Sequence, residues 1–234
     1  MNLRRLSIVL SFCNEQENMP ELIARLRSAC NSIPNFTYEL IFVNDCSSDR
    51  SVEILKHEQS RKNDIVIVTT SRRFGYSECV LAGLRFSTGD FAVYIDSDLQ
   101  DPPELIPKML EMALSEGADV IYTTRTSRLG ETWIKLMITR LGYWILNSVS
   151  AVSVPYNSGD FKLLSRRAVD QILEFREQKP FIRGLVSWIG FKQVQFFYER
   201  QARVAGKTHF PIFSRKVIYN FLDSALISFS DVPL

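Results

Sequence analysis

Residues 90–116 read DFAVYIDSDLQDPPELIPKMLEMALSE: a β-branched and aromatic run, then a polar turn, then an amphipathic stretch. The run predicts a strand over Asp90–Asp96, because near-continuous apolar residues are typical of a parallel strand covered on both faces. A helix is expected over Glu104–Glu116. Its start is indicated by Asp101 as N-cap, with Pro102 and Pro103 in the first turn. This strand–turn–helix unit predicts an α/β fold.

The same alternation fills the first half of the chain. A second clear helix is expected over Glu17–Asn31, which places Leu22, Ile23 and Leu26 on one face. Strands that alternate with helices predict a doubly wound, mostly parallel α/β sheet. Ligands bind such sheets at the carboxyl ends of the strands, where the strand order reverses, so chemistry is expected just after each strand. The expected strands are Leu6–Phe12, Tyr38–Asn44, Asp64–Thr70, Asp90–Asp96 and Asp119–Thr124.

The second half of the chain no longer shows this regular alternation of strands and helices. A long helix is expected over Glu131–Ser153, followed by a turn at Gly159–Asp160, a polar helix, and an aromatic, strand-like run at Lys192–Tyr198. Towards the end, apolar residues from Phe213 to Phe229 recur on one helical face. This stripe fits either core packing or an interfacial membrane helix.

The composition is that of a folded globular protein. Of the 234 residues, 46% are apolar and 23% are charged, which excludes a disordered chain, a collagen-like fibre and a disulfide-dense mini-protein. A net charge of +2 does not predict nucleic-acid binding, which usually shows as a strong basic excess on one face.

No apolar run reaches the roughly 18 residues of a spanning helix. The run Leu6–Phe12 follows two arginines but lacks the cleavage site of a signal peptide.

The cysteines give no sign of a metal site. They are Cys13, Cys30, Cys46 and Cys79, with no close pair at metal-ligand spacing, and the chain has two histidines. A zinc site is therefore not expected. We expect reduced core thiols in a cytosolic environment.

Two carboxylates, Asp96 and Asp98, lie one residue apart at the end of an expected strand. From there both can reach a hard divalent cation, and Gln100 adds a further oxygen donor. Such an ion bridges substrate phosphates and neutralises the charge of a departing diphosphate. The alternative is that Asp98 and Asp101 only cap the turn and the next helix. Phosphatases that form an aspartyl-phosphate also use such a pair, but they usually carry Thr or Val where this chain has Gln100.

The ends of the first two strands are also polar. Asn14 and Glu15 follow the first strand, and Asn44 and Asp45 close the second. Small and acidic residues at consecutive strand ends suit a nucleoside, whose base and ribose hydroxyls need acceptors. Helix capping, by Asn14, Ser48 or Asp49, is the alternative. No G-x-G-x-x-G follows the first strand and no G-x-x-x-x-G-K-[ST] occurs, which disfavours dinucleotide cofactors and P-loop hydrolysis.

Together these segments resemble the inverting family-two glycosyltransferases with the GT-A fold, and among them the polyprenyl-phosphate sugar transferases. The resemblance spans nearly the whole chain. Its most specific parts are the string DSDLQDPPE at residues 96–104 and the GDF segment at residues 159–161. Supporting parts are Asn14-Glu15, Asn44-Asp45, Ser71-Arg72, Phe74-Gly75, Ala82-Gly83-Leu84, Arg125, Arg183-Gly184, Trp188-Ile189-Gly190-Phe191, Arg203 and Ser228-Phe229-Ser230.

The resemblance implies a role for each candidate residue. For the nucleotide sugar these are Glu15, Asn44, Asp45, Arg72 and Asp96; for Mg²⁺ or Mn²⁺, Asp98 and Gln100; and for catalysis, Asp160, Arg125, Arg200 and Arg203. Asp160 resembles the candidate general base near the acceptor. The three arginines would face the diphosphate or the lipid phosphate.

The chain also departs from the family pattern. Ser11 and Cys13 replace the usual Pro and Tyr, Cys46 replaces a Gly, and Arg73 replaces an Asn. The segment 207–209, Lys-Thr-His, stands where a Ser/Thr-Lys pair is expected. Histidine is mostly neutral at pH 7 and lysine is not, so the expected contact with a phosphate is weaker here.

The leading hypothesis is metal-dependent transfer of a hexose from a nucleotide sugar to polyprenyl phosphate, with inversion. The resemblance favours a UDP-hexose as donor, with GDP-mannose as the alternative. A lipid phosphate is a competent nucleophile without much deprotonation, so the enzyme mainly has to hold two anionic substrates together. A metal and arginines do this, and residues 192–216 carry six Lys/Arg against one acid.

Two other functions stay open. The sugar could go to a glycan or protein hydroxyl, in which case Asp160 would have to act as a true general base. The chain could also be a nucleotide-sugar-binding module without turnover, as the departures at Ser11, Cys46 and His209 would allow.

The resemblance also implies a division of the chain and a location. Residues 1–210 form the catalytic domain, and residues 211–234 an amphipathic, membrane-proximal segment. We expect the protein at the cytoplasmic face of the cell membrane, either peripheral or followed by spanning helices that this chain lacks. The sequence leaves its oligomeric state open, with a homo-oligomer as one alternative.

Overall fold

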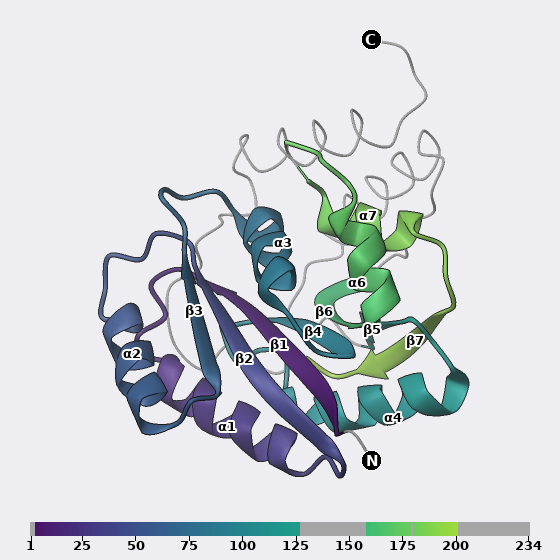
Figure 1. The fold of residues 1–234 in the computed structure, drawn as a ribbon, viewed down its shortest axis with the longest axis horizontal. Coiled ribbons are helices and arrows are strands. Elements are labelled where there is room, and N and C mark those ends of the chain that lie inside the picture. Colours follow the sequence, from purple (N-terminus) through teal and green to yellow (C-terminus); the bar gives the residue numbers. More distant parts are fainter. Residues whose placement is uncertain (1–2, 127–157, 179, 201–234) are drawn as a thin grey trace.

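The computed structural model describes residues 3–126, 158–178 and 180–200. Its centre is a seven-stranded sheet with the order β3-β2-β1-β4-β6-β5-β7 (Figure 1). Neighbouring strands pair in parallel, except that β6 is antiparallel to both β4 and β5. The expected doubly wound, mostly parallel sheet is confirmed. The strands are β1 (Arg4–Phe12), β2 (Phe36–Asn44), β3 (Ile65–Thr69), β4 (Phe91–Asp96), β5 (Val120–Arg125), β6 (Ser158–Ser165) and β7 (Gln193–Tyr198).

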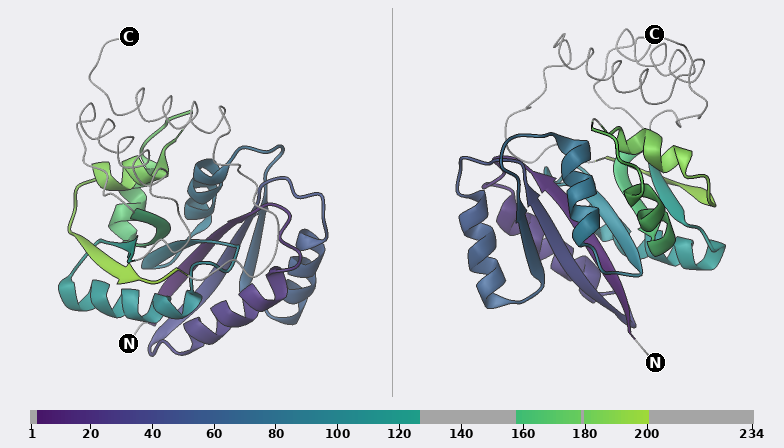
Figure 2. Two further views of the ribbon diagram at one scale, coloured as in Figure 1. Left: turned by 180° about the vertical axis from the view of Figure 1, so that it is seen from behind. Right: turned by 45° about the horizontal axis from the view of Figure 1, so that its top comes forward.

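Helices cover both faces of the sheet (Figures 1 and 2). On one face lie α1 (Met19–Asn31), α2 (Ser51–Arg61) and α4 (Ile106–Glu116), and on the other lie α3 (Tyr76–Phe86), α6 (Arg166–Leu173) and α7 (Ile182–Trp188). The strands send alternate side chains into the two cores: Ile8 and Leu10 of β1 into the first, Val9 into the second. The expected apolar face of α1 is confirmed, since Leu22 and Leu26 are fully buried.

Gly159 and Asp160 lie inside β6, so the turn expected there is wrong. The sequence reads as a turn because glycine and aspartate are rare in strand interiors. Here a Cβ on Gly159 would lie 2.8 Å from Thr123 Oγ1 of β5. The glycine therefore allows two strands to approach closely, and Asp160 is carried by a central strand of the sheet.

Asp101 does not cap the helix that follows it, contrary to the expectation from the sequence. Pro103–Leu105 form a short 3₁₀ helix, and α4 begins at Ile106 without a side-chain cap. Asp101 is instead fully buried and accepts hydrogen bonds from Tyr198 and Arg200. The prolines begin the helical turn on their own, which leaves the carboxylate free to bind the end of β7.

Some predictions fall outside the described residues. They concern the helix over 131–153, Arg203, the segment 207–209 and the amphipathic segment 211–234. Within the described ranges, none of the helices has the length and apolar character needed to cross a membrane.

The four cysteines are free thiols, but they are not all core residues. Cys30 and Cys79 are buried as expected. Cys46 is exposed and Cys13 is half-buried, so the expectation is wrong for these two. Both follow the last residues of strands, in the loops after β1 and β2.

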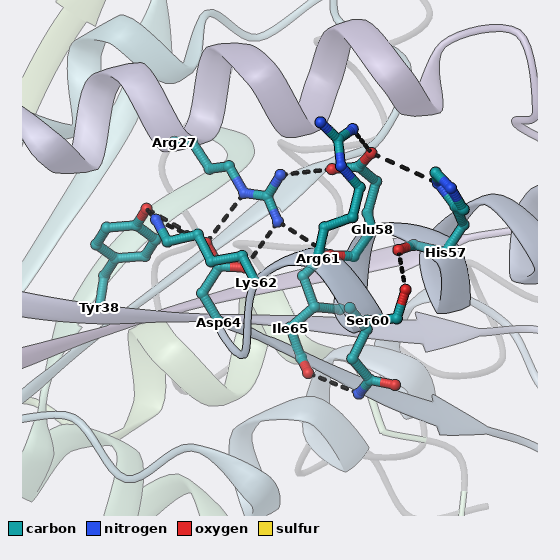
Figure 3. Close-up of polar contacts among 10 residues, drawn as sticks. Arg27, Tyr38, His57, Glu58, Ser60, Arg61, Lys62, Asp64 and Ile65 are labelled. Atoms are coloured by element: carbon teal, nitrogen blue, oxygen red, sulfur yellow. Dashed lines mark hydrogen bonds and ion pairs between the residues drawn. The ribbon is translucent and has the colours of Figure 1, made fainter.

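A polar network ties α1 to α2 and to the start of β3 (Figure 3). Arg27 of α1 donates to both oxygens of Asp64, at 3.0 and 2.8 Å, and to Glu58 of α2 at 2.6 Å. Lys62 lies 3.0 Å from the same Asp64 carboxylate and contacts Tyr38 of β2. Burial raises the pKa of Asp64, but the hydrogen bonds from Arg27 and Lys62 outweigh it and hold that pKa below its ordinary value.

We expect Asp64→Asn to destabilise the fold by about 2–3 kcal/mol at pH 7, because two charge-assisted hydrogen bonds are lost from a buried carboxylate. A depressed pKa contributes stability above the unfolded value of about 3.9 and loses it as pH falls through the folded value. The difference from wild type should therefore be full at neutral pH and shrink below about pH 4. Urea unfolding at several pH values measures this. Glu53→Gln is the control, because Glu53 pairs with Arg50 on the surface; equal stability of the two variants would contradict the prediction.

Candidate active site

A pocket of about 320 Å³ opens at the carboxyl ends of β1, β2 and β4. Ser11 of β1 pairs with Asp96 of β4, and the strand order reverses between these two strands. The pocket thus lies where doubly wound sheets bind their ligands. Its lining includes six of the expected site residues: Glu15, Asp45, Asp96, Asp98, Gln100 and Arg200.

The backbone around this pocket adopts an uncommon conformation after three of its strands. Asn14 follows β1 with φ 57°, Cys46 follows β2 with φ 59°, and Leu99 follows β4 with φ 60°. Residues other than glycine rarely adopt positive φ. Conformations of this kind gather at functional sites, where the surrounding structure enforces them.

Several polar residues after β1 and β2 hold the two loops together. Asn44 Oδ1 accepts from the backbone N–H of Ser47 at 2.8 Å, and Asn14 Oδ1 accepts from that of Ser48 at the same distance. Asp49 accepts from the N–H groups of Gln16 and of Ser51, both at 3.0 Å. The N-cap residues of α1 and α2 are Asn18 and Arg50, and neither helix has a side-chain hydrogen bond at its cap, so the capping alternative is wrong in its detail: these side chains tie the loops instead. Asn44 is buried and does not line the pocket, so its contact with a nucleotide stays a prediction.

Asp45 both lines the pocket and organises the loop after β3. Its Oδ1 accepts from the backbone N–H of Phe74 at 2.7 Å and its Oδ2 from that of Gly75 at 3.2 Å. The same loop carries Arg72, whose guanidinium lies 4.0 Å above the ring of Phe74. Arg72 is exposed and lies outside the pocket lining. Glu15, on the other wall, accepts from Asn18 Nδ2 at 2.6 Å.

We expect Asp45→Ala to weaken donor binding by about 1–3 kcal/mol, because it removes acceptors both for the nucleoside and for the loop after β3. This corresponds to roughly 5- to 150-fold in Kd, measurable by calorimetry with a nucleoside diphosphate. Asp45→Asn is the matched variant, since its amide oxygen can still accept from Phe74 N–H, and it should lose less. Unchanged donor affinity in Asp45→Ala would show that this carboxylate is not part of the nucleoside site.

Three carboxylates, at the last residue of β4 and in the turn after it, surround one guanidinium. Arg200, two residues after β7, lies 3.7 Å from Asp96, 3.9 Å from Asp98 and 3.1 Å from Asp101. Asp101 Oδ2 is buried and has no hydrogen-bond partner among the residues that the structure describes. One guanidinium balances one of three negative charges, so this part of the pocket attracts a further cation.

The crowding of negative charge has its largest effect at Asp96. Burial raises the pKa of Asp96 well above its ordinary value, and the neighbouring charges of Asp160, Asp101 and Asp98 raise it further, against the opposing effect of Arg200. Bringing a cation close would favour the charged carboxylate again. The donor set therefore suits a positively charged ligand.

Asp98 and Gln100 are the residues expected from the sequence to hold such an ion. They belong to one turn, in which Asp98 Oδ1 accepts from Gln100 N–H at 3.1 Å, and both line the pocket. In the described ranges no three Asp, Glu, His or Cys side chains form a ready-made metal site. Mg²⁺ commonly binds through one or two carboxylates together with substrate phosphates, and the uncompensated charge here fits that mode.

Asp160 lies on the next strand, near Asp96. The pairing of β4 with β6 ends with Tyr94 opposite Lys162, and two residues beyond it Asp96 and Asp160 are close enough for the charge of Asp160 to raise the pKa of Asp96. Arg183 of α7 forms a two-pronged ion pair with Asp160: Nε donates to Oδ1 at 2.6 Å and Nη2 donates to Oδ2. The expected catalytic carboxylate is thus held by an arginine and lies near Asp96, outside the lining of the pocket.

The surroundings of Asp160 keep it ionised. Burial raises its pKa, but the charge and hydrogen bonds of Arg183, and the charges of Lys162 and Arg125, outweigh burial and lower the pKa below its ordinary value. Arg125 is the last residue of β5, and its Nε is buried without a hydrogen-bond partner in the described part of the chain. Three cations therefore act on this one carboxylate.

A model of the family described as "Glycosyl transferase family 2" matches residues 7–173. The chain belongs to glycosyl transferase family 2. A glycosyltransferase of Bacillus subtilis, YkcC, is 40% identical over 228 residues, which is 97% of this chain and 69% of that protein. The bactoprenol glucosyl transferase of Shigella phage SfX is 31% identical over 230 residues, 98% of this chain and 74% of that one.

Solved structures of other proteins share the fold of this family 2 glycosyltransferase. TarS of S. aureus, residues 1–349 in complex with UDP-GlcNAc, superposes with a TM-score of 0.65 at 16% identity, over 98% of this chain and 68% of that one. The mannosyltransferase PcManGT of Pyrobaculum calidifontis, in complex with GDP-Man and Mn²⁺, gives 0.62 at 13% identity, over 98% and 66%. The expected GT-A fold and glycosyltransferase activity are confirmed.

Three residues near the candidate site of this glycosyltransferase had no role predicted for them from the sequence: Lys162, Arg183 and Tyr198. Arg183 appeared only as part of the resemblance. Tyr198 donates to the buried Asp101. Each comes from an element whose neighbours are fixed by the tertiary fold. A lysine inside the apolar run FKLL of residues 161–164 is the one signal that could have drawn attention to β6.

Proposed function

We propose that this glycosyltransferase moves a hexose from a nucleotide-diphosphate sugar to polyprenyl phosphate, with inversion at the anomeric carbon. The observation that carries the proposal is the state of Asp160, the carboxylate near Asp96. It is clamped by Arg183, and its pKa is lowered, since the surrounding cations outweigh burial. Such a carboxylate suits an acceptor that is already ionised, and not one whose proton a strong base has to remove.

A carboxylate with a lowered pKa is a poor proton acceptor, because an efficient general base has its pKa near the operating pH. A sugar or protein hydroxyl would need that help. A lipid phosphate has a second pKa of about 6 and is largely ionised at neutral pH. Asp160 and Arg183 then orient and hold an acceptor that is already a nucleophile, which supports the phosphate acceptor over the hydroxyl one.

The donor half would use the pocket between β1, β2 and β4. Its acidic lining at Glu15 and Asp45 suits the N–H and hydroxyl groups of a nucleoside, and Asp96 would lie on the nucleotide side of the metal. Arg72 and Asn44 complete the proposed nucleotide-sugar site from the adjoining loops. TarS and PcManGT are complexes with UDP-GlcNAc and GDP-Man, and we favour a UDP-hexose here because bactoprenol glucosyl transferases are among the relatives.

A divalent cation, Mg²⁺ or Mn²⁺, would be held by Asp98 and Gln100 together with the donor diphosphate. Its chemistry is to neutralise the charge that develops on the departing nucleoside diphosphate. The chain's own cations would add to this neutralisation. Arg200 already contacts Asp98 and can turn towards a phosphate, with Arg125 and Arg203 as further proposed contacts. A Mn²⁺ complex among the related folds supports the choice of ion class.

A polyprenyl phosphate acceptor has consequences for location. The acceptor is embedded in a membrane, so the protein would work at the cytoplasmic face of the cell membrane. The amphipathic segment 211–234 would lie near that surface, with residues 1–210 as the catalytic domain. Whether the enzyme acts as a homo-oligomer would be tested separately, by light scattering.

The test is a transfer assay with a panel of labelled nucleotide sugars and three acceptors: undecaprenyl phosphate, undecaprenol and a soluble oligosaccharide. Of the three acceptors, we expect only undecaprenyl phosphate to become labelled. One nucleotide sugar should give a transfer rate far above that of the others. Transfer to undecaprenol or to the oligosaccharide at a similar rate would contradict the proposal. Tight binding of a nucleotide sugar without transfer to any acceptor would favour a binding module.

A further inference from the structure

Lys162 is a buried cation in the middle of the sheet. Its exposed fraction is 2%, and it lies on β6 between Tyr94 of β4 and Tyr122 of β5. It has no hydrogen bond and no ion pair within 4 Å to any described residue. A buried ammonium without a direct partner opposes folding, because burial disfavours the charged form. Such a residue calls for a reason other than stability.

The charged groups near Lys162 belong to the acceptor half of the site. Asp160 is two residues away on the same strand and therefore on the same face of the sheet. Its attraction favours the charged form of Lys162, while Arg183 of α7 opposes it. On the same face, α6 packs through Ala168, Val169 and Ile172, and the end of β4 contributes Asp96, whose pKa is raised in part by the charge of Asp160.

Three tyrosines lie near Lys162 and Asp160. Tyr94 Oη, on the strand beside Lys162, is buried and has no hydrogen-bond partner among residues 3–126, 158–178 and 180–200. Tyr76 of α3 donates to the backbone oxygen of Asp160 at 3.0 Å. Tyr122 lies across from Lys162 on β5. The polar interior behind Asp160 thus contains the amine of Lys162 and the hydroxyl of Tyr94, neither of which has a hydrogen-bond partner in the described structure.

An anionic acceptor would change the charge balance at this place. Asp160 already lies near Asp96, and Arg183 is engaged in its two-pronged pair. Arg125 at the end of β5 also acts on Asp160, but two carboxylates and a phosphate would outnumber Arg125 and Arg183, so a phosphate that arrives beside Asp160 needs a further positive charge. We propose that Lys162 is a positioning residue for the acceptor, a buried charge that compensates the acceptor phosphate next to Asp160. This inference rests on the proposed function.

The proton equilibrium of Lys162 supports this assignment. Burial lowers its pKa from the ordinary 10.5 to about 7, with Asp160 acting in the opposite direction. In the unliganded protein the amine is therefore partly neutral near pH 7. A neighbouring anion favours the charged form, so acceptor binding should be accompanied by uptake of a proton at Lys162.

The kinetic test uses Lys162→Met and Lys162→Arg. At pH 7 we expect Lys162→Met to raise the KM for undecaprenyl phosphate about tenfold or more, with nucleoside diphosphate affinity unchanged, and Lys162→Arg to restore most of the loss. The Tm of Lys162→Met should equal or exceed that of wild type, because an apolar chain of similar length replaces a buried charge. Lys192→Met is the control, since Lys192 is exposed and pairs with Glu116 far from the pocket.

A second measurement does not depend on any variant. Calorimetric titration of the wild type with undecaprenyl phosphate at pH 8, in buffers of different ionisation enthalpy, reports the protons taken up. At this pH the phosphate itself is fully ionised, so uptake points to Lys162, and Lys162→Met should abolish it. No uptake by wild type, or a wild-type acceptor KM in Lys162→Met, would overturn the inference and leave the proposed function standing. A wild type that neither binds nor glycosylates undecaprenyl phosphate would overturn the proposed function and this inference with it.

Discussion

Asp98→Asn should lose roughly 10²–10³-fold in kcat/KM for sugar transfer, because a metal ion contributes several kcal/mol to stabilising a departing diphosphate. The asparagine keeps an oxygen for the hydrogen bond from Gln100 N–H, so the turn after β4 should persist. The loss should therefore reflect the missing negative charge and not a rearranged loop. Transfer kinetics with saturating Mg²⁺ or Mn²⁺ measure it.

The same variant should abolish the metal dependence of donor binding. In wild type, calorimetry should show much tighter binding of a nucleoside diphosphate with the divalent ion than with chelator. Asp170→Asn is the control: Asp170 is an exposed residue of α6, paired with Arg166, and should behave as wild type. Equal donor affinity of the wild type with and without the ion would contradict the assignment of Asp98 and Gln100.

Asp160→Asn should cost about 10²-fold in transfer rate near pH 5.5, towards the lower end of general-base effects. The loss should shrink as pH rises towards 8.5, because the acceptor phosphate, with a second pKa of about 6, loses its proton without help. Asp160 itself does not titrate in this window: the cations around it outweigh burial and hold its pKa below the ordinary value. Lys162, whose pKa is about 7, does titrate in this window, so the same profile measured in Lys162→Met separates its contribution from that of the acceptor phosphate. Rates of variant and wild type across this range give the profile.

This substitution also breaks the pair with Arg183, so a control for a broken arginine pair is needed. Asp119→Asn serves, because Asp119, at the amino end of β5, forms the same two-pronged contact with Arg167. It should leave transfer unchanged at every pH. A loss in Asp160→Asn towards 10⁴-fold that does not recover with pH would favour a hydroxyl acceptor.

The strands of the first half could be predicted from the sequence to within about two residues at each end, for a simple physical reason. They are covered on both faces, so nearly every side chain is apolar and the run itself marks the strand. β6 could not be predicted in this way. It carries Gly159, Asp160 and Lys162 among its apolar residues, and its antiparallel place between β4 and β5 is set by the tertiary fold.

The donor side of the site was similarly accessible to sequence reasoning. Residues at the ends of parallel strands gather at one edge of the sheet, which brings Glu15, Asp45 and Asp98 into one pocket. The acceptor side depends on which strands are neighbours. Only the order β4-β6-β5 brings Asp96 near Asp160, and only the packing of α7 brings Arg183 to that carboxylate. Periodicity gives the face of an element but not its neighbour.

The most direct test of the central claim is the identity of the product made by purified protein from a nucleotide hexose, undecaprenyl phosphate and Mg²⁺ or Mn²⁺. Mass spectrometry and NMR of the extracted lipid should show one hexose joined to the phosphate, with inverted anomeric configuration, and no such lipid when a chelator is added. A retained configuration, a sugar on a hydroxyl, or equal product with the chelator would contradict the account.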